Sequence, residues 1–259
     1  MKPPSSKLNR VHEEDWEDKM KKIAFATAAV TMLLTGAASA ADLAARPYAK
    51  APVPVAAVYN WTGFYIGVSG GGGWGRTDWQ YISAPVSPNT NHDISGWLAG
   101  GQAGYNWQAG SWVFGLEGDA HGADISGSAL CPNPGFVCGS KVDTLASFRG
   151  RIGYAAGPVL FYGTGGAGYA HAKYSAVTPG GPNFFTSADR WGYAAGAGIE
   201  WGFAPNWSAK VEYMHYGFDR WTAPVGALSN TSPADLRLNI DTVKAGVNYR
   251  FGGPIVARY

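Results

Sequence analysis

The feature that most constrains the fold is an alternation of apolar and polar residues that recurs eight times along the chain. The eight stretches cover 61–75, 94–108, 111–122, 142–156, 158–172, 189–203, 206–218 and 238–251. In the third stretch, Trp112, Phe114 and Leu116 share one face, while Glu117 and Asp119 occupy the other. A period of two over such lengths is typical of β-strands. The chain is therefore expected to be all-β.

The connections between these stretches alternate strictly between long and short. The long connections are 76–93, 122–141, 173–188 and 219–237, and the short ones are 109–110, 157 and 204–205. Hairpins with turns on one side and long loops on the other are typical of outer-membrane barrels. The order predicts an eight-stranded antiparallel up-and-down transmembrane β-barrel with its long connections outside the cell.

The composition favours a membrane barrel over other all-β folds. The 259 residues include 37 Gly, with 14% aromatic and 15% charged residues, and the mean hydropathy is −0.12. Aromatic residues such as Trp112 and Trp207 lie at strand ends, as in the girdles at the level of lipid headgroups. Only a closed sheet can enter lipid without unpaired backbone groups. A soluble β-sandwich is the architectural alternative. The net charge of +2 gives no basic footprint for nucleic acid.

Charged residues on the polar faces are expected to point into the barrel. Side chains essentially fill the interior of an eight-stranded barrel, and buried charges are costly unless they are paired. We therefore expect an ion-pair network that plugs the lumen, with no catalytic, metal or cofactor site. Its predicted members are Glu117, Asp119, Arg149, Arg151, Arg190, Glu200, Lys210, Glu212, Lys244 and Arg250.

The N-terminus has the pattern of an export signal. Met20-Lys21-Lys22 is a short basic region, 23–41 carries no charge, and small residues precede a cleavage point after Ala40. The polar residues 1–19 are unusual before a signal, so Met20 is the expected start of translation. The expected domains are 1–40 (extension and signal peptide), 41–60 (periplasmic linker), 61–251 (barrel) and 252–259 (tail).

The two cysteines, Cys131 and Cys138, are separated by six residues in a connection rich in Pro and Gly. Exported proteins occupy an oxidising compartment, and the pair lacks neighbours at metal-ligand spacing. A local disulfide is predicted.

The last strand carries a second pattern. Lys244, Gly246, Tyr249 and Phe251 place polar, glycine and aromatic residues at the spacing of the β-signal, which the barrel-assembly machinery recognises. The usual signal ends at the terminal residue, whereas this chain continues to Tyr259.

Several segments resemble a known family. They are YNWTGFYIG at 59–67, GQAGYNW at 101–107, FRGRIGY at 148–154 and AKVEY at 209–213. Together they resemble the small outer-membrane β-barrel proteins of alpha-proteobacteria, the surface-antigen or porin-family proteins related to the OmpA-type transmembrane domain, over roughly 41–251. The resemblance implies an eight-stranded barrel in the Gram-negative outer membrane with structural, adhesive or immunogenic roles. Outer-membrane lipid is its expected partner, and a monomer its expected state.

Two other functions stay open. A narrow channel for ions or small solutes would need the charged network to open. A lipid-modifying enzyme would need a His/Ser or His/carboxylate constellation facing lipid, for which His171 and His215 are candidates without a matching hydroxyl. Gly163 to Gly168 matches a dinucleotide motif, but a strand-like segment follows it where that site needs a helix.

The long connections carry aromatic residues among polar ones. These residues either bind an extracellular ligand or host factor, or pack the connections on the barrel rim. They are Trp79, Tyr81, Phe136, Phe184, Phe185 and Trp221.

Overall fold

The structure is a computed structural model that describes residues 59–82, 89–131 and 135–251. The predicted signal peptide with its extension, nearly all of the predicted linker and the C-terminal tail lie outside the described residues. In the part described, no helix has the length and apolar character needed to cross a membrane.

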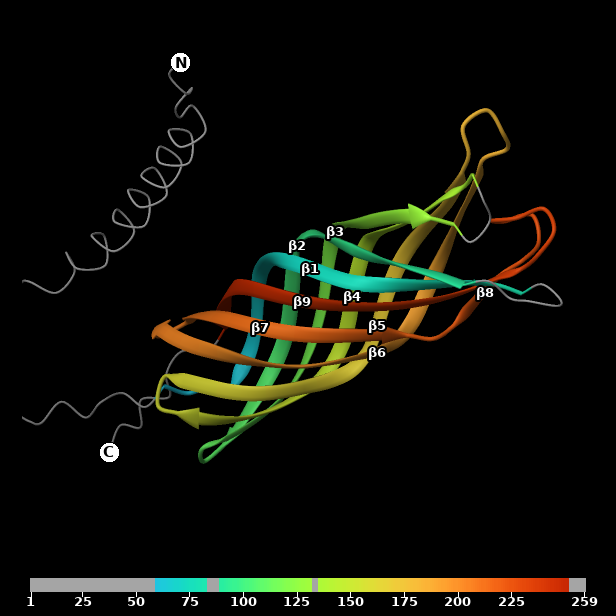
Figure 1. The fold of residues 1–259 in the computed structure, drawn as a ribbon. Coiled ribbons are helices and arrows are strands. Elements are labelled where there is room, and N and C mark those ends of the chain that lie inside the picture. The colour runs from blue at the N-terminus through green and yellow to red at the C-terminus, as the bar shows by residue number, and fades with distance from the viewer. Residues whose placement is uncertain (1–58, 83–88, 132–134, 252–259) are drawn as a thin grey trace, which may run out of the picture. The chain divides into compact units, whose positions relative to one another are not determined.

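Eight long strands form one closed antiparallel ring, which confirms the predicted barrel (Figure 1). Each strand pairs with the next, and the last long strand pairs back on the first. A three-residue strand, β8, pairs only with the last long strand at its loop end. The strands are β1 (Gly63–Tyr81), β2 (Asn89–Ala109), β3 (Trp112–Leu130), β4 (Val137–Ala156), β5 (Val159–Val177), β6 (Phe184–Ala204), β7 (Trp207–Phe218), β8 (Trp221–Ala223) and β9 (Ala234–Phe251).

The strands are staggered around the ring. The line of paired residues that starts at Ile66 on β1 passes through every long strand and returns to β1 at Arg76, ten residues further along. Such a stagger requires the strands to tilt against the barrel axis. The tilt is visible in Figure 1.

The strands are longer than the sequence predicted. Apart from β7, the ring strands run for 18 to 21 residues, whereas a strand needs only ~9–11 residues to cross a bilayer. The excess lies at the end of the long connections, so the predicted extents of those loops are wrong. Much of 76–93, 122–141, 173–188 and 219–237 is strand.

The reason is a reversal of polarity along each strand. On β9, Leu236, Leu238 and Ile240 are buried inside the barrel, while Arg237 and Asn239 alternate with them on the outside. Closer to the turns the alternation has the opposite sign. The loop end of the barrel therefore has an apolar interior and a polar exterior, as a water-soluble barrel would.

Two rows of aromatic side chains mark the part of the exterior that faces lipid. Trp107, Trp112 and Trp207 are exposed near the short turns, and Trp74 and Trp97 are exposed further up. On β2, the segment from Trp97 to Trp107 matches the ~9–11 residues of a membrane-crossing strand. Beyond the upper row, towards the loop end, the outward-facing residues are polar, and we call this polar part of the exterior the collar. Its charged members include Arg76, Asp93, Asp124, Lys141, Asp143, Lys173, Asp189 and Asp241.

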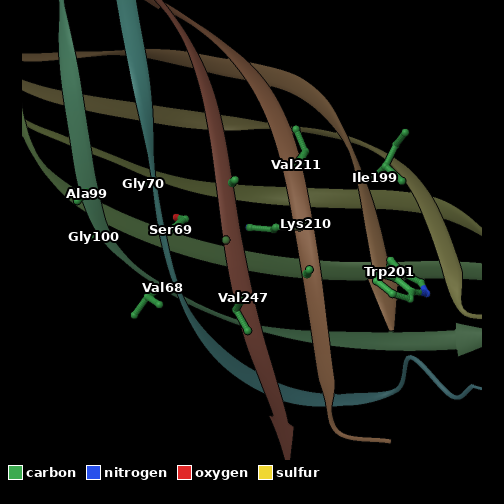
Figure 2. Close-up of a pocket in the computed structure, with 13 residues that line it drawn as sticks. Val68, Ser69, Gly70, Ala99, Gly100, Ile199, Trp201, Lys210, Val211 and Val247 are labelled. Carbon is green, nitrogen blue, oxygen red and sulfur yellow. The ribbon is translucent and has the colours of Figure 1, made fainter. Parts of the chain in front are cut away.

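The lipid-facing surface is not smooth. A hollow of about 890 Å³ lies over β1, β2, β6, β7 and β9, and Val68, Val211 and Trp201 line it together with small residues such as Gly70 and Ala99 (Figure 2). Its lining is mainly apolar, as expected for a surface that contacts lipid chains.

The position of the lipid band predicts where a charge is tolerated. Ala103 faces outward midway between the two aromatic rows, whereas Asn91 faces outward in the collar. Ala103→Arg should reduce the free energy of unfolding by about 2–4 kcal/mol, and Asn91→Arg by about 0–1 kcal/mol, because the cost of a charge depends on its depth in the bilayer. Urea unfolding in phospholipid vesicles, followed by tryptophan fluorescence, measures both. Equal losses would place the band elsewhere.

Candidate functional site

The inward-facing side chains of the barrel form three layers. On β4, from the turn end to the loop end, the inward residues include Ala155 first, then Arg151 and Arg149, and then Leu145 and Val142. The other strands repeat this order. The bottom layer is an apolar cluster of Trp61, Val113, Ala155, Leu160 and Tyr162, with Tyr59 packed against it.

The top layer is a larger apolar cluster inside the barrel, at the level of the collar. It contains Ile94, Ile125, Leu145, Met214 and Ile240 among other buried residues. The long-connection aromatics belong here. Trp79 and Tyr81 are buried within the cluster, and three others pack against it: Phe136, Phe184 and Trp221. Phe185 differs, with 72% of its surface exposed.

The middle layer is charged, and Arg149 is its centre. Its guanidinium donates to Glu117 at 2.5 Å, to Asp119 at 2.6 Å and to Glu212 at 3.2 Å. All four side chains are at most 3% exposed. The hydrogen bonds come from both ends of the guanidinium, a geometry that a lysine could not reproduce.

Three further cations complete the layer. Lys210 lies 3.0 Å from Glu117, and Lys244 lies 3.4 Å from both Asp119 and Glu212. Arg151 pairs with Glu200 at 2.8 Å. Four carboxylates thus meet four cations, so the layer is formally neutral.

Aromatic and neutral polar side chains also join the network, and the sequence analysis did not identify them. Tyr65 donates its hydroxyl to Glu117 at 2.7 Å, and Tyr162 donates to Glu212 at 3.0 Å. The guanidinium of Arg151 lies 3.9 Å from the centre of the Tyr162 ring. The alternation could have identified both tyrosines, because each falls on the inward face of its strand.

Two predicted members of the network lie elsewhere. Arg190 is in the upper part of the barrel, where it donates to the Tyr174 hydroxyl and to the main-chain carbonyls of Asp219 and Leu236. Arg250 is at the turn end, over the Tyr59 ring and bonded to a main-chain carbonyl. Alternation alone predicts which face a residue occupies but not its partner, so it grouped both arginines with the carboxylates.

A directed chain of hydrogen bonds crosses the lumen beside the ion pairs. Asn248 donates to Glu200 at 2.9 Å, Gln102 donates to Asn248 at 2.8 Å, and Ser69 donates to Gln102 at 2.7 Å. The chain is tightly packed around Gly67, where an added Cβ would lie 2.0 Å from the Asn248 oxygen. Glycine at this position therefore makes room for the chain.

This chain fixes the tautomer of His121. Because the Ser69 proton points to Gln102, His121 must donate from Nε2 to Ser69 over their 2.9 Å contact. His121 Nδ1 lies 3.7 Å from Asp119, too far for a hydrogen bond. A serine hydrolase needs the opposite arrangement, in which histidine accepts from serine and donates to aspartate. Ser69, His121 and Asp119 therefore do not form a nucleophilic triad in this state.

The carboxylates of Glu117, Asp119 and Glu212 lie within 4.8 Å of one another. That spacing also suits metal ligands. Here the cations of Arg149, Lys210 and Lys244 already bind the same oxygens, so these carboxylates have partners without an ion.

The cysteines lie at the loop end of the barrel. Cys131 and Cys138 form a disulfide with an S–S distance of 2.03 Å, just after β3 and near the start of β4. It closes the connection between these two strands.

The four residues of the predicted assembly signal lie on β9 at its junction with β1. Lys244 points inward into the ion-pair layer, and Gly246 pairs with Ser69. Tyr249 and Phe251 face outward with ring centres 5.0 Å apart, and Phe251 also meets Phe64 across the junction. Recognition by the assembly machinery stays a prediction.

Two histidines face outward near the upper aromatic row, each with a carboxylate. Asp189 accepts from His171 Nδ1 and from the Tyr169 hydroxyl, both at 2.8 Å. Asp241 accepts in the same way from His215 at 2.8 Å and from Tyr213 at 2.6 Å. The barrel exterior thus carries two copies of one Tyr–His–Asp arrangement.

The sequence of this barrel matches a known protein family and several of its members. Residues 26–251 match the model of the outer membrane protein beta-barrel domain. The 31 kDa outer-membrane immunogenic protein of Brucella melitensis biotype 1 is 30% identical over 246 residues, covering 90% of this chain and all of that protein. The 22 kDa outer membrane protein of Rhizobium leguminosarum bv. viciae is 33% identical over 166 residues, covering 62% of this chain and 66% of that protein.

Solved outer-membrane proteins also match. The attachment invasion locus protein Ail of Yersinia pestis aligns with 71% of this chain and 98% of its own, at 17% identity and a TM-score of 0.35. OprG of Pseudomonas aeruginosa aligns with 73% of this chain and 97% of its own, at 11% identity and a TM-score of 0.43.

Removing one member of the ion-pair layer should strongly destabilise the barrel, because the remaining buried charges lose a partner. Arg149→Met leaves three buried carboxylates short of a partner, and breaking a buried pair in this way costs about 3–5 kcal/mol. Arg76→Met is the matched control, because Arg76 pairs with Asp93 on the exposed collar and such pairs contribute about 1 kcal/mol or less. Urea unfolding in vesicles compares the two. A loss for Arg149→Met no larger than the control would contradict the described network.

Proposed function

Because the chain belongs to the outer membrane protein β-barrel domain family, we propose that it is a structural, non-enzymatic outer-membrane protein whose lumen does not conduct. It supports the envelope and presents its loop end to the surroundings. Outer-membrane lipid surrounds the apolar band between the aromatic rows.

The observation that carries this proposal is the layered lumen. A charged layer by itself could move and admit water or ions. Here apolar clusters lie below and above it, and the charged side chains between them are at most 4% exposed. Opening a path would break several buried ion pairs, and each broken pair costs several kcal/mol.

The packing of the loop end supports a role in presentation. The cross-strand ion pairs of the collar and the apolar cluster inside it hold the strands together beyond the lipid. Loops on rigid scaffolds carry function disproportionately. Contact with an extracellular ligand or host factor through this end is therefore part of the proposal.

Planar-bilayer recording tests the closed lumen. The purified full-length barrel should give no reproducible current steps, since two buried apolar clusters enclose the buried charged layer in the described part of the barrel. Steps seen with the native protein and lost in Arg149→Met, but retained in Arg76→Met, would replace this proposal with that of a narrow channel.

Lipid modification is the second candidate function. The two outward His–Asp pairs favour it, because a histidine bonded to a carboxylate through Nδ1 has Nε2 available as a base. Against it, the hydroxyl beside each pair belongs to a tyrosine that already donates to the aspartate. We therefore keep the non-enzymatic function as the proposal.

Mass spectrometry of lipid A decides between these two functions. Cells that overproduce the protein should give the same lipid A spectrum as cells that overproduce His171→Ala/His215→Ala. A gain or loss of an acyl chain or headgroup that occurs only with the native protein would establish an enzyme.

A further inference from the structure

A second hollow, distinct from the lipid-facing one, lies on the outer flank of the collar over β3 to β6. Its volume is about 490 Å³. Two rows of outward side chains cross it, as the strand register shows. The row nearer the membrane pairs Lys141 with Lys173 and Lys173 with Ser187, and the next row pairs Gly139 with Ser175 and Ser175 with Phe185.

The lysine pair is the unusual element. Lys141 and Lys173 are directly opposite each other on adjacent strands, and like charges in this position destabilise a sheet. Each ammonium bonds one carboxylate, Lys141 to Asp124 at 2.8 Å and Lys173 to Asp143 at 2.7 Å. An ammonium has three N–H donors, so both lysines keep donors for a ligand. Their side chains remain about half exposed.

The remaining lining adds neutral hydrogen-bonding groups and one ring. Ser175 and Ser187 lie in the hollow, and neither hydroxyl has a hydrogen-bond partner among the described residues. Phe185, the one exposed aromatic of the predicted set, also lines it. An apolar ring beside hydroxyls and cations suits a ligand with both apolar and polar faces.

Glycine keeps the hollow open. An added Cβ at Gly139 would lie 2.7 Å from the Ser175 hydroxyl oxygen. Any larger residue at this position would therefore occupy the space beside that hydroxyl.

We propose that this hollow binds an anionic sugar, whose phosphate, sulfate or carboxylate group contacts Lys141 and Lys173 while its hydroxyls and ring contact Ser175, Ser187 and Phe185. Charge-assisted hydrogen bonds from two ammonium groups favour an anion. A saccharide supplies the neutral hydroxyls and a flat face for the ring. This inference goes beyond the closed lumen and does not depend on it.

Anionic sugars of this kind could reach the hollow from two sources, the membrane and the surroundings of the cell. The hollow opens sideways on the collar, just beyond the aromatic row that includes Trp191 and Tyr169, so phosphorylated sugars of outer-leaflet glycolipid are within reach. Free polyanionic saccharides outside the cell present the same groups.

Binding measurements with the full-length protein in detergent test the proposal. The probes are rough lipopolysaccharide, the same lipopolysaccharide after removal of its phosphates, and a soluble sulfated oligosaccharide. Lys141→Gln/Lys173→Gln should weaken binding of a charged probe at least tenfold, and Phe185→Ser should weaken it several-fold. Dephosphorylation should have an effect similar to that of the double variant if lipopolysaccharide is the ligand.

The matched control is Arg76→Gln/Arg220→Gln. These two arginines are also exposed on the collar, and each is also paired with an aspartate. The control should change affinity less than twofold, and unboiled gel migration should show all variants folded. Tight binding of lipopolysaccharide identifies a membrane source, and binding of the oligosaccharide alone identifies an external one. Equal losses in both double variants, or no binding by the native protein, would overturn the site.

Discussion

Closure of the sheet by the pairing of β1 with β9 is the constraint from which the other features follow. Lipid offers no partners to backbone groups, so the ring must be complete. A ring of eight strands leaves an interior only as wide as its own side chains. Charges directed into so narrow a space must neutralise one another, and Arg149 does so by bonding three carboxylates at once. The closed ring that lipid requires thus sets the width of the lumen, and the narrow lumen requires the buried charges to pair.

The polarity of the strands changes where the surrounding solvent changes. Within lipid, apolar side chains point outward and the charged layer lies inside. Beyond the upper aromatic row the same strands continue with Leu236, Leu238 and Ile240 inside and polar residues outside. The barrel therefore has two parts, built from the same strands, in which the inside and outside have opposite polarity. Each part buries the side chains that its own environment rejects.

The sequence was sufficient for the ring of eight strands and for the inward position of the charges, because a period of two assigns faces directly. It was insufficient for the strand ends and for the partners. In 76–93 the alternation has the opposite sign, so the sequence predicts a loop where the structure continues both strands. Arg190 and Arg250 share the inward phase of Arg149, yet their heights along the axis give them other partners. Height depends on the ten-residue stagger of the ring, which appears only when the strands are paired.

The extended collar has a consequence for how this protein can diversify. Because the strands continue above the bilayer as a cylinder with an apolar interior and a polar exterior, the connecting segments begin at a level that does not contact lipid. Their composition and length can change without altering either the hydrophobic fit to the membrane or the charged layer far below. Variation at the cell surface is thereby separated mechanically from the part of the molecule that anchors it.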